Sequence, residues 1–449
     1  MSQNKTIYAC SKCGSQFPKW LGQCSECGAW GTISETVQNN SPRKNFTTTK
    51  AGEVIEFSAI KSQNFSRFKT GIEELDRVLG GGLVPGSLIL LGGAPGIGKS
   101  TLVLQIVHSL SNDSVLYVSG EESAEQVKLR LERIGVSGNN LKFFGDTDVD
   151  VICATIEKHT PKIAVVDSIQ TVSSSGVDSE AGSVNQIRAS TAKLMEVGKK
   201  TQTTIFIVGH ITKQGSVAGP KTLEHLVDVV LYLEGDSHHH FRFLRSYKNR
   251  FGSTNEVGVF EMKKQGLVEI KNPSEVFLAN RNSQVISGSV IAAIMEGVRP
   301  FLIEVQALVS KTNFGYPQRK STGFDFNRLQ LLVAVLTKRC GLRLENQDIH
   351  INIVGGLEIS EPAADLAVAM AIASAFYNKP IDGKTLFFGE VGLAGELRNV
   401  SWPEKRIKEA EKLGFEKIVM SKEKFLDFQP KIKIIQEENL SQAIKVVLG

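Results

Sequence analysis

The chain contains a glycine-rich segment whose residue types suit the binding of a polyphosphate. The segment has the pattern G-x-x-x-x-G-K-[ST] and consists of Gly93, Ala94, Pro95, Gly96, Ile97, Gly98, Lys99 and Ser100, followed by Thr101. A polyphosphate needs several converging backbone N–H donors, and a glycine-rich turn lets the main chain approach that closely. In such a loop the lysine reaches the β- and γ-phosphates, and the serine hydroxyl ligates Mg²⁺. The segment predicts binding and hydrolysis of a nucleoside triphosphate.

The sequence on either side of this loop supports that interpretation over an ordinary glycine turn. Residues 87–91 form an apolar run that predicts a buried strand, and residues 101–110 have the pattern of an amphipathic helix. A phosphate loop connects a strand to a helix in this way. The loop is therefore expected at the C-terminal edge of a sheet.

Carboxylates with the positions of an ATPase site follow two further apolar runs. Asp167 ends the run 163–166, which is the Walker B arrangement, and is expected to hold Mg²⁺ through water. Glu121 and Glu122 follow the run 116–118, and one of them is expected to orient the attacking water. Glu121 is favoured. The alternative is that both belong to the solvated start of a helix.

Three cations lie at positions from which they could contact a phosphate. His210 follows the run 204–208 and is either a sensor of the γ-phosphate or a structural histidine. Lys248 and Arg250 lie between two alternating runs, which predicts a hairpin with these cations at its tip. A cation aimed at a transferring phosphate lowers the barrier strongly and often comes from a neighbouring subunit. A plain basic hairpin is the alternative.

Four cysteines near the N-terminus have the spacing of a zinc site. They are arranged as two C-x-x-C pairs and are Cys10, Cys13, Cys24 and Cys27. Four thiolates suit tetrahedral Zn²⁺. The glycine after each pair can take a positive φ and turn backbone N–H groups toward the sulfurs. Two disulfides or a thiol redox pair are the alternatives. A structural zinc is favoured, and the module is too small to fold without it.

Other cysteines and two tryptophans are assigned to cores. Cys153 and Cys340 lie in apolar sequence and are expected to be core thiols rather than ligands. Trp20 and Trp30 are expected to pack against the zinc module, with exposure toward a partner as the alternative.

Composition sets broad limits. The chain has 449 residues, of which 41% are hydrophobic, and a formal net charge of +5. This balance permits a nucleic-acid partner without requiring one. No apolar stretch reaches membrane-spanning length and no signal peptide precedes the cysteines, so a cytoplasmic protein without membrane contact is expected.

The chain divides into four parts by pattern. Residues 1–34 are the zinc module, and the polar residues 35–60 are a flexible linker. Residues 61–272 alternate strand-like and helical patterns, which predicts an α/β domain built on a parallel sheet. The strand-like runs are 87–91, 114–118, 163–166, 204–208 and 227–233. Residues 273–449 form a separate α+β region.

These motifs together resemble the RadA (Sms) family of bacterial recombination ATPases. The resemblance spans essentially the whole chain and rests on the zinc module and on four segments, TGIEELD at 70–76, GAPGIGKST at 93–101, YVSGEES at 117–123 and KNRFG at 248–252. KNRFG is the most specific of them.

The resemblance implies both architecture and activity. The implied fold is a RecA-like core assembled as a hexameric ring and related to replicative helicases of the DnaB type. The implied activity is DNA-dependent ATP hydrolysis with branch migration of recombination intermediates, on single-stranded and branched DNA, alongside a RecA-type recombinase. Lys248 and Arg250 are implied to enter the ATP site of the adjacent subunit or to contact DNA.

The C-terminal region resembles the proteolytic domain of Lon. The similar segments are NIVGGL at 352–357 and EPAADLA at 361–367. Lon-type proteases use a Ser–Lys dyad, but Ala363 occupies the serine position and Glu404 best matches the lysine position. Because proteolysis needs an activated hydroxyl, the domain is expected to be inactive and to serve ring assembly and DNA contact. Its basic pairs 319–320 and 338–339 either face phosphates or form a solvated surface.

The DNA-contacting segments are expected in two loops rich in Ser, Gly and small polar residues. These are the flexible loops 172–185 and 214–223, with Lys213 and Lys221 as phosphate contacts. Two other functions fit parts of the sequence, namely an ATP-dependent Lon-like protease and a signalling ATPase of the KaiC type.

Overall fold

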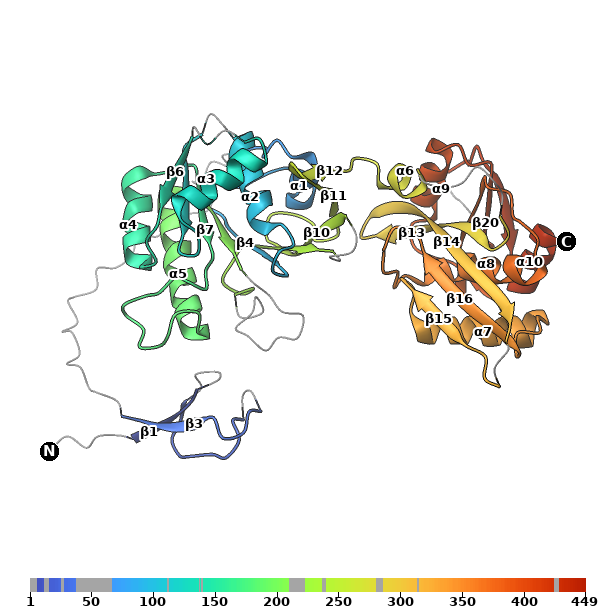
Figure 1. Cartoon of the computed structure of the whole chain (residues 1–449), viewed down its shortest axis with the longest axis horizontal. Helices are drawn as coiled ribbons and strands as arrows, with labels where there is room; N and C mark the ends of the chain where they lie inside the picture. Colours follow the sequence, from blue (N-terminus) through green and yellow to red (C-terminus); the bar gives the residue numbers. More distant parts are fainter. Residues whose placement is uncertain are drawn as a thin grey trace, which may run out of the picture.

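The computed structural model describes residues 6–11, 16–25, 28–37, 67–110, 113–136, 138, 140–209, 223–235, 240–279, 286–312, 315–423 and 428–449. Along the chain these residues form a small N-terminal sheet, an α/β domain and a C-terminal α+β domain (Figure 1).

The N-terminal module is a small antiparallel sheet. Its strands are β1 (Thr6–Cys10), β2 (Gln16–Phe17) and β3 (Ile33–Val37), in the order β2-β1-β3. The buried residues of the described part are Cys10, Cys24 and Ile33. β3 continues past residue 34, so the sheet extends beyond the boundary expected for this module.

The α/β domain is built on a mixed sheet whose central strands are parallel. These strands are β9 (Val229–Glu234), β4 (Leu88–Gly93), β8 (Thr204–Val208), β7 (Ile163–Asp167), β5 (Val115–Ser119) and β6 (Leu141–Phe144), in that order. The predicted apolar runs are confirmed as strands. β6 was not predicted, because it is short and only partly buried.

Helices cover both faces of this sheet. Residues of α1 (Glu73–Leu79), α2 (Lys99–Ser109) and α3 (Ala124–Arg133) pack on one face, and those of α4 (Val149–His159) and α5 (Val184–Thr201) on the other. Alternate residues of β4 enter the two cores. A strand buried on both faces is a continuous apolar run, which is why these strands were predictable.

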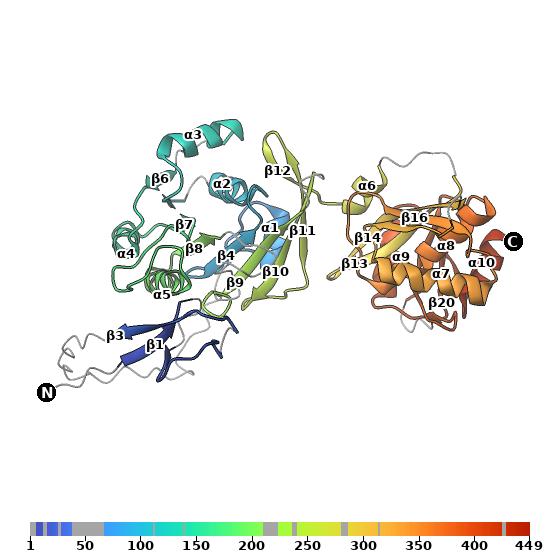
Figure 2. The ribbon, with the colours of Figure 1, turned by 60° about the horizontal axis from the view of Figure 1, so that its bottom comes forward.

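Three antiparallel strands extend the sheet beyond β9 toward the C-terminal domain (Figure 2). They are β10 (Phe241–Asn249), β11 (Val257–Lys263) and β12 (Gly266–Glu269), and the predicted hairpin is confirmed as β10–β11. Leu244 packs in the ATPase core, whereas Phe241 and Phe243 pack against the C-terminal core. β10 therefore lies between the two cores.

The C-terminal domain is a second mixed sheet with helices on both faces. Its strand order is β15-β16-β14-β13-β17-β20-β21. The strands are β13 (Ser289–Glu296), β14 (Arg299–Lys311), β15 (Arg319–Thr322), β16 (Gln347–Ile353), β17 (Thr385–Phe388), β20 (Lys417–Ser421) and β21 (Lys433–Glu437), with the separate pair β18 (Glu390–Val391) and β19 (Leu397–Arg398). The helices are α6 (Pro273–Leu278), α7 (Phe326–Cys340), α8 (Asp365–Tyr377), α9 (Pro403–Lys412) and α10 (Leu440–Leu448).

Ion pairs and backbone contacts join the two larger domains. Arg299 at the start of β14 lies 2.6 Å from the buried carboxylate of Glu74 in α1. Arg245 of β10 lies 2.6 Å from Glu296 at the end of β13. The Val298 N–H donates to the Asn255 carbonyl at 3.0 Å. The C-terminal domain is thus packed on the strands that extend the ATPase sheet.

A buried cation anchors α9 in the C-terminal domain. Arg406 is 0% exposed, and its guanidinium donates to the carbonyl oxygens of Ala293 at 2.6 Å and Ser401 at 3.2 Å. The same guanidinium pairs with the carboxylate of Glu361, which also accepts from the Met295 N–H at 2.6 Å. A buried guanidinium is tolerated only while its charge is compensated.

We expect Glu361→Gln to lower the free energy of unfolding of this domain by about 3 kcal/mol, since it leaves the buried charge of Arg406 uncompensated. Urea denaturation of the full-length protein measures the loss. Glu404→Gln is the matched control, because Glu404 forms a 4.0 Å surface pair with Lys408 and should cost less than about 0.5 kcal/mol. Equal stabilities of the two variants would contradict the role assigned to the Arg406 pair.

Candidate nucleotide site

The glycine-rich loop connects the C-terminal end of β4 to α2, as predicted. Gly93 and Gly98 have φ values of 152° and 113°. A Cβ atom on Gly93 would lie 2.5 Å from the Leu233 carbonyl oxygen, and one on Gly98 would lie 2.6 Å from the Met262 side chain. Gly93 therefore requires glycine for space as well as for backbone conformation, whereas Gly98 requires it for its positive φ, because the Met262 methyl can move aside.

The lysine of this loop folds over the turn. Lys99 is buried, and its ammonium donates to the carbonyl oxygens of Gly93 at 2.9 Å and Ala94 at 3.0 Å. Burial lowers the pKa of this ammonium, while the nearby carboxylates of Asp167 and Glu121 act in the opposite direction. The positive charge is thus held at the N-terminal end of α2, where backbone N–H groups attract an anion.

Asp167 lies at the same edge of the sheet, at the end of β7. It is buried and directly paired in the ladder with Ser119, at the end of the neighbouring β5. Its Oδ2 atom accepts a hydrogen bond of 2.6 Å from the hydroxyl of Tyr117. Burial and the Asp167 carboxylate hold the pKa of the Tyr117 hydroxyl well above its ordinary value. Tyr117 was not identified from the sequence, because an aromatic residue in a buried strand predicts only packing.

The two glutamates after β5 have different partners. The carboxylate of Glu121 accepts a hydrogen bond from the Ser168 hydroxyl, next to Asp167 in the chain. The carboxylate of Glu122 forms an ion pair with Arg130 on α3. Glu121 also influences the charge of Lys99 in the phosphate loop. Glu121, rather than Glu122, therefore lies among the residues of the candidate site.

Lys248 and Arg250 lie at the opposite edge of the sheet. Asn249 of β10 pairs with Val229 at the start of β9, and Val229 pairs with Ile89 near the start of β4. The phosphate loop follows the other end of β4, about 13 Å farther at about 3.3 Å per residue. Lys248 and Arg250, called here the candidate finger, thus do not lie at the phosphate loop of their own chain.

Contacts within the chain hold both cations at that edge. Arg250 Nη1 lies 3.0 Å from Asp228 Oδ1, and the Arg250 side chain is still 49% exposed. The other Asp228 oxygen accepts from the Leu88 N–H at 3.1 Å. Lys248 Nζ donates to the Val227 carbonyl oxygen at 2.9 Å. Burial lowers the pKa of Lys248, and Arg250 adds to this effect.

Some predicted residues lie outside the described part of the chain. They are Cys13, Cys27, His210, Lys213 and Lys221, together with most of the loop 214–223.

The loop 172–185 is described and is bonded to the first turn of α5, and its contact with DNA stays a prediction. The side-chain amide of the buried Gln186 accepts from the Ser174 N–H at 2.7 Å. The same amide donates to the carbonyl oxygens of Ser174, Val177 and Ser179 at 3.3, 2.8 and 2.9 Å. These bonds fix the loop against α5.

The described half of the predicted zinc site is compatible with a metal. Cys10 and Cys24 are both buried in the small core of the module. Gly28 has a φ of 67°, as predicted, and its N–H donates to the Cys24 carbonyl oxygen at 2.8 Å. A core of this size is insufficient by itself, so a cross-link by a metal fits the residues present. Among the described residues, no group of three or more His, Cys, Asp or Glu could hold a metal.

The two tryptophans that were expected to pack against the module are largely exposed. Trp20 is 60% exposed and Trp30 is 75% exposed. The Trp20 indole N–H donates to the Ile33 carbonyl oxygen at 3.1 Å, which holds the ring at the surface of the module. Tyr8, Phe17 and Leu21 are the hydrophobic residues that pack against the cysteines instead.

Cys153 and Cys340 have the properties expected of core thiols. Both are half-buried and lie beside hydrophobic cores. Burial raises the pKa of each thiol to about 11, so neither is a reactive thiolate at neutral pH.

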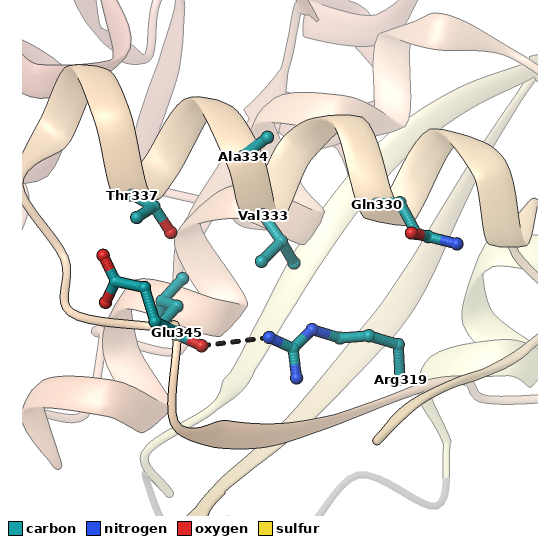
Figure 3. Close-up of a pocket in the computed structure, with 7 residues that line it drawn as sticks. Arg319, Gln330, Val333, Ala334, Thr337 and Glu345 are labelled. Atoms are coloured by element: carbon teal, nitrogen blue, oxygen red, sulfur yellow. Dashed lines mark hydrogen bonds between the residues drawn. The ribbon is translucent and has the colours of Figure 1, made fainter. Parts of the chain in front are cut away.

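The C-terminal domain contains a shallow pocket of about 380 Å³ between α7 and β15 (Figure 3). Val333, Ala334 and Leu344 supply apolar lining. The guanidinium of Arg319 donates to the carbonyl oxygens of Leu344 at 2.9 Å and Gln318 at 3.1 Å, and also to that of Gln347. Arg319 therefore has a structural role, and the alternative that it faces a phosphate is not supported.

The position expected for a protease nucleophile is fully buried. Ala363 is 0% exposed in the short 3-10 helix Pro362–Ala364, which leads directly into α8.

Within the described residues, no helix combines the length and hydropathy needed to cross a membrane.

Matches to known families cover all three units. Residues 56–216 match the family model described as AAA domain, residues 8–35 match Rubredoxin metal binding domain, and residues 318–424 match Subunit ChlI of Mg-chelatase. With the sheet topology, these matches confirm the predicted fold class, a RecA-like P-loop ATPase core with an N-terminal zinc-binding module and a Lon-like α+β region.

Curated relatives match over the full length. The chain is 48% identical over 458 residues to DNA repair protein RadA of Bacillus subtilis (strain 168), with all of both chains covered. It is 48% identical over 453 residues to the protein of the same name from Listeria monocytogenes, covering 100% of this chain and 99% of that one. The Halalkalibacterium halodurans protein of that name is 46% identical, with both chains fully covered. The chain belongs to the family of DNA repair protein RadA, and it contains an ATPase domain.

Proposed function

We propose that the chain is a DNA-dependent ATPase with a helicase-like motor activity, which promotes branch migration of recombination intermediates in DNA repair. Family membership supports the pathway. The observation that carries the chemistry is the convergence of Lys99, Asp167 and Glu121 at one edge of the sheet. We expect the protein in the cytoplasm, where its DNA substrate lies.

The residues present fit ATP and Mg²⁺. The N–H groups of the loop 93–98 and of α2 would bind the phosphates, with Lys99 contributing a charge that is already desolvated. Ser100 and Asp167 would hold the metal, directly or through water. When bound, Mg²⁺ would neutralise the negative charge that develops on the phosphates.

Glu121 would orient the attacking water and accept its proton. Its carboxylate accepts a hydrogen bond from the hydroxyl of Ser168, which keeps it beside Asp167. Glu122 would have to leave Arg130, which makes it the weaker candidate.

The position of Lys248 and Arg250 supports a site shared between subunits. Because these cations lie at the edge opposite to the phosphate loop of their own chain, they can complete a site only in another copy. A head-to-tail contact of this kind forms a ring when its rotation closes and a filament when it does not, and we propose a closed hexamer.

DNA is the proposed polymer substrate, single-stranded or branched, handled together with a RecA-type recombinase. We propose that the zinc module, with Cys10, Cys13, Cys24 and Cys27 as ligands, serves contact with one of these partners. The C-terminal domain is proposed as an inactive scaffold, since the buried Ala363 has no nucleophile.

The effect of DNA on the ATPase rate separates the proposed motor from a signalling ATPase, and a casein assay separates it from an ATP-dependent protease. We expect the ATPase rate of the full-length protein to rise several-fold with single-stranded DNA and to be unchanged by heparin at equal charge. Casein should remain intact in the same mixture. An ATPase rate that ignores DNA would favour a signalling ATPase, and ATP-dependent loss of casein would favour a protease.

Paired variants test the choice between the two glutamates. Glu121→Gln should lower kcat by about 10²-fold or more while ATP still binds, because the general base is lost. Glu122→Gln, which removes only a partly exposed pair with Arg130, should change kcat by less than about fivefold. The reverse order of effects would exclude Glu121 as the base.

Mixing of variants tests action across a subunit interface. Arg250→Ala should lower ATP turnover by about 10³-fold, and Asp167→Ala should abolish it. In an equal random mixture, about a quarter of the interfaces would combine an intact Asp167 with an intact Arg250, so part of the activity should return. A mixture no more active than its components, at concentrations where the ring exchanges subunits, would contradict a shared site.

A further inference from the structure

The buried hydroxyl of Tyr117 donates a hydrogen bond to Asp167, the carboxylate that we propose binds the metal. Tyr117 lies in the middle of β5 and is fully buried. Its hydroxyl donates to Asp167 Oδ2 at 2.6 Å. Phenylalanine would fill the same space without the cost of burying a hydroxyl. Packing therefore does not explain a tyrosine here, and its hydroxyl acts on the Asp167 carboxylate to which it donates.

The strand register explains why this phenol reaches Asp167. Tyr117 is paired with Val165 of β7, and Asp167 follows two residues later on the same face of that strand. A diagonal neighbour of this kind lies within reach of a long aromatic side chain. The other carboxylate oxygen, Oδ1, receives no hydrogen bond from any residue that the structure describes.

We propose that Tyr117 is a positioning residue, which fixes the rotation of the Asp167 carboxylate so that Oδ1 is presented to the metal and its water. The inference rests on the proposed role of Asp167 in metal binding. A charge-assisted hydrogen bond from a phenol is short and directional, so it restricts the carboxylate more than packing does.

The phenol is in the donor form at neutral pH, since an ordinary phenol has a pKa of about 10. Its proton lies on the 2.6 Å bond to Asp167 Oδ2. Tyr117 therefore orients the carboxylate and does not transfer a proton.

Tyr117→Phe in the full-length protein tests this role. The probe is Mn²⁺, titrated by electron paramagnetic resonance with a non-hydrolysable ATP analogue present. We expect Mn²⁺ affinity to fall about tenfold, the size expected for one hydrogen bond to a charged group. The affinity for the metal-free analogue should not change, because the lost hydroxyl bonds to the carboxylate of Asp167.

Two comparisons separate positioning from general packing. Tyr232→Phe removes a partly buried hydroxyl from the same sheet and should leave Mn²⁺ affinity unchanged. In an Asp167→Asn background, adding Tyr117→Phe should have no further effect, because the partner is already lost. 3-Fluorotyrosine at position 117 keeps the size and the donor, and it should bind Mn²⁺ at least as tightly as the original protein.

The outcomes distinguish this inference from the proposed function. Asp167→Asn with unchanged Mn²⁺ affinity would overturn the role of Asp167 itself. If Asp167→Asn weakens Mn²⁺ binding and Tyr117→Phe does not, the positioning role alone is wrong. If the fluorotyrosine protein loses affinity as Tyr117→Phe does, the effect comes from packing and the proposal is also overturned.

Discussion

The direction of the parallel strands decides where each charge of this site lies. β4, β5 and β7 are paired in one orientation, so their C-terminal ends share an edge that holds the phosphate loop, Glu121 and Asp167. The antiparallel β10 runs back from that edge and carries Lys248 and Arg250 to the other side. A single chain thus separates its phosphate-binding groups from its candidate finger. This separation is the physical basis for proposing that two copies complete one site.

β10 and β11, whose hairpin carries Lys248 and Arg250, also link the nucleotide site to the C-terminal domain. One face of β10 packs in the ATPase core and the other against the C-terminal core. On the first face, Arg242 Nε donates to the Ile97 carbonyl oxygen of the phosphate loop at 3.3 Å, and on the second Arg245 pairs with Glu296. Buried Glu74, within the TGIEELD segment, binds both the Val259 N–H at 2.9 Å and Arg299. These contacts connect the phosphate loop to the domain interface.

Features set by local sequence could be predicted, and features set by contacts across the sheet could not. The central strands are continuous apolar runs, and the loop glycines are required by local backbone geometry, so both were predictable. β6 was missed because its four residues are only partly buried. The opposite placement of Arg250 depends on the register of β10 with β9, and the Tyr117–Asp167 bond depends on that of β5 with β7. Trp20 and Trp30 are exposed because other hydrophobic residues fill the small core of the module. The spacing of these residues along the sequence does not show which of them will do so.

The central claim is that catalysis is completed by a second copy of the chain, and a structure of the assembled protein with an ATP analogue and DNA tests it most directly. The account predicts that the Arg250 guanidinium has left Asp228 and lies within hydrogen-bond distance of the γ-phosphate bound by the neighbouring chain. An analogue held in the 93–101 loop with no cation from another subunit near its γ-phosphate, and Arg250 still on Asp228, would contradict it.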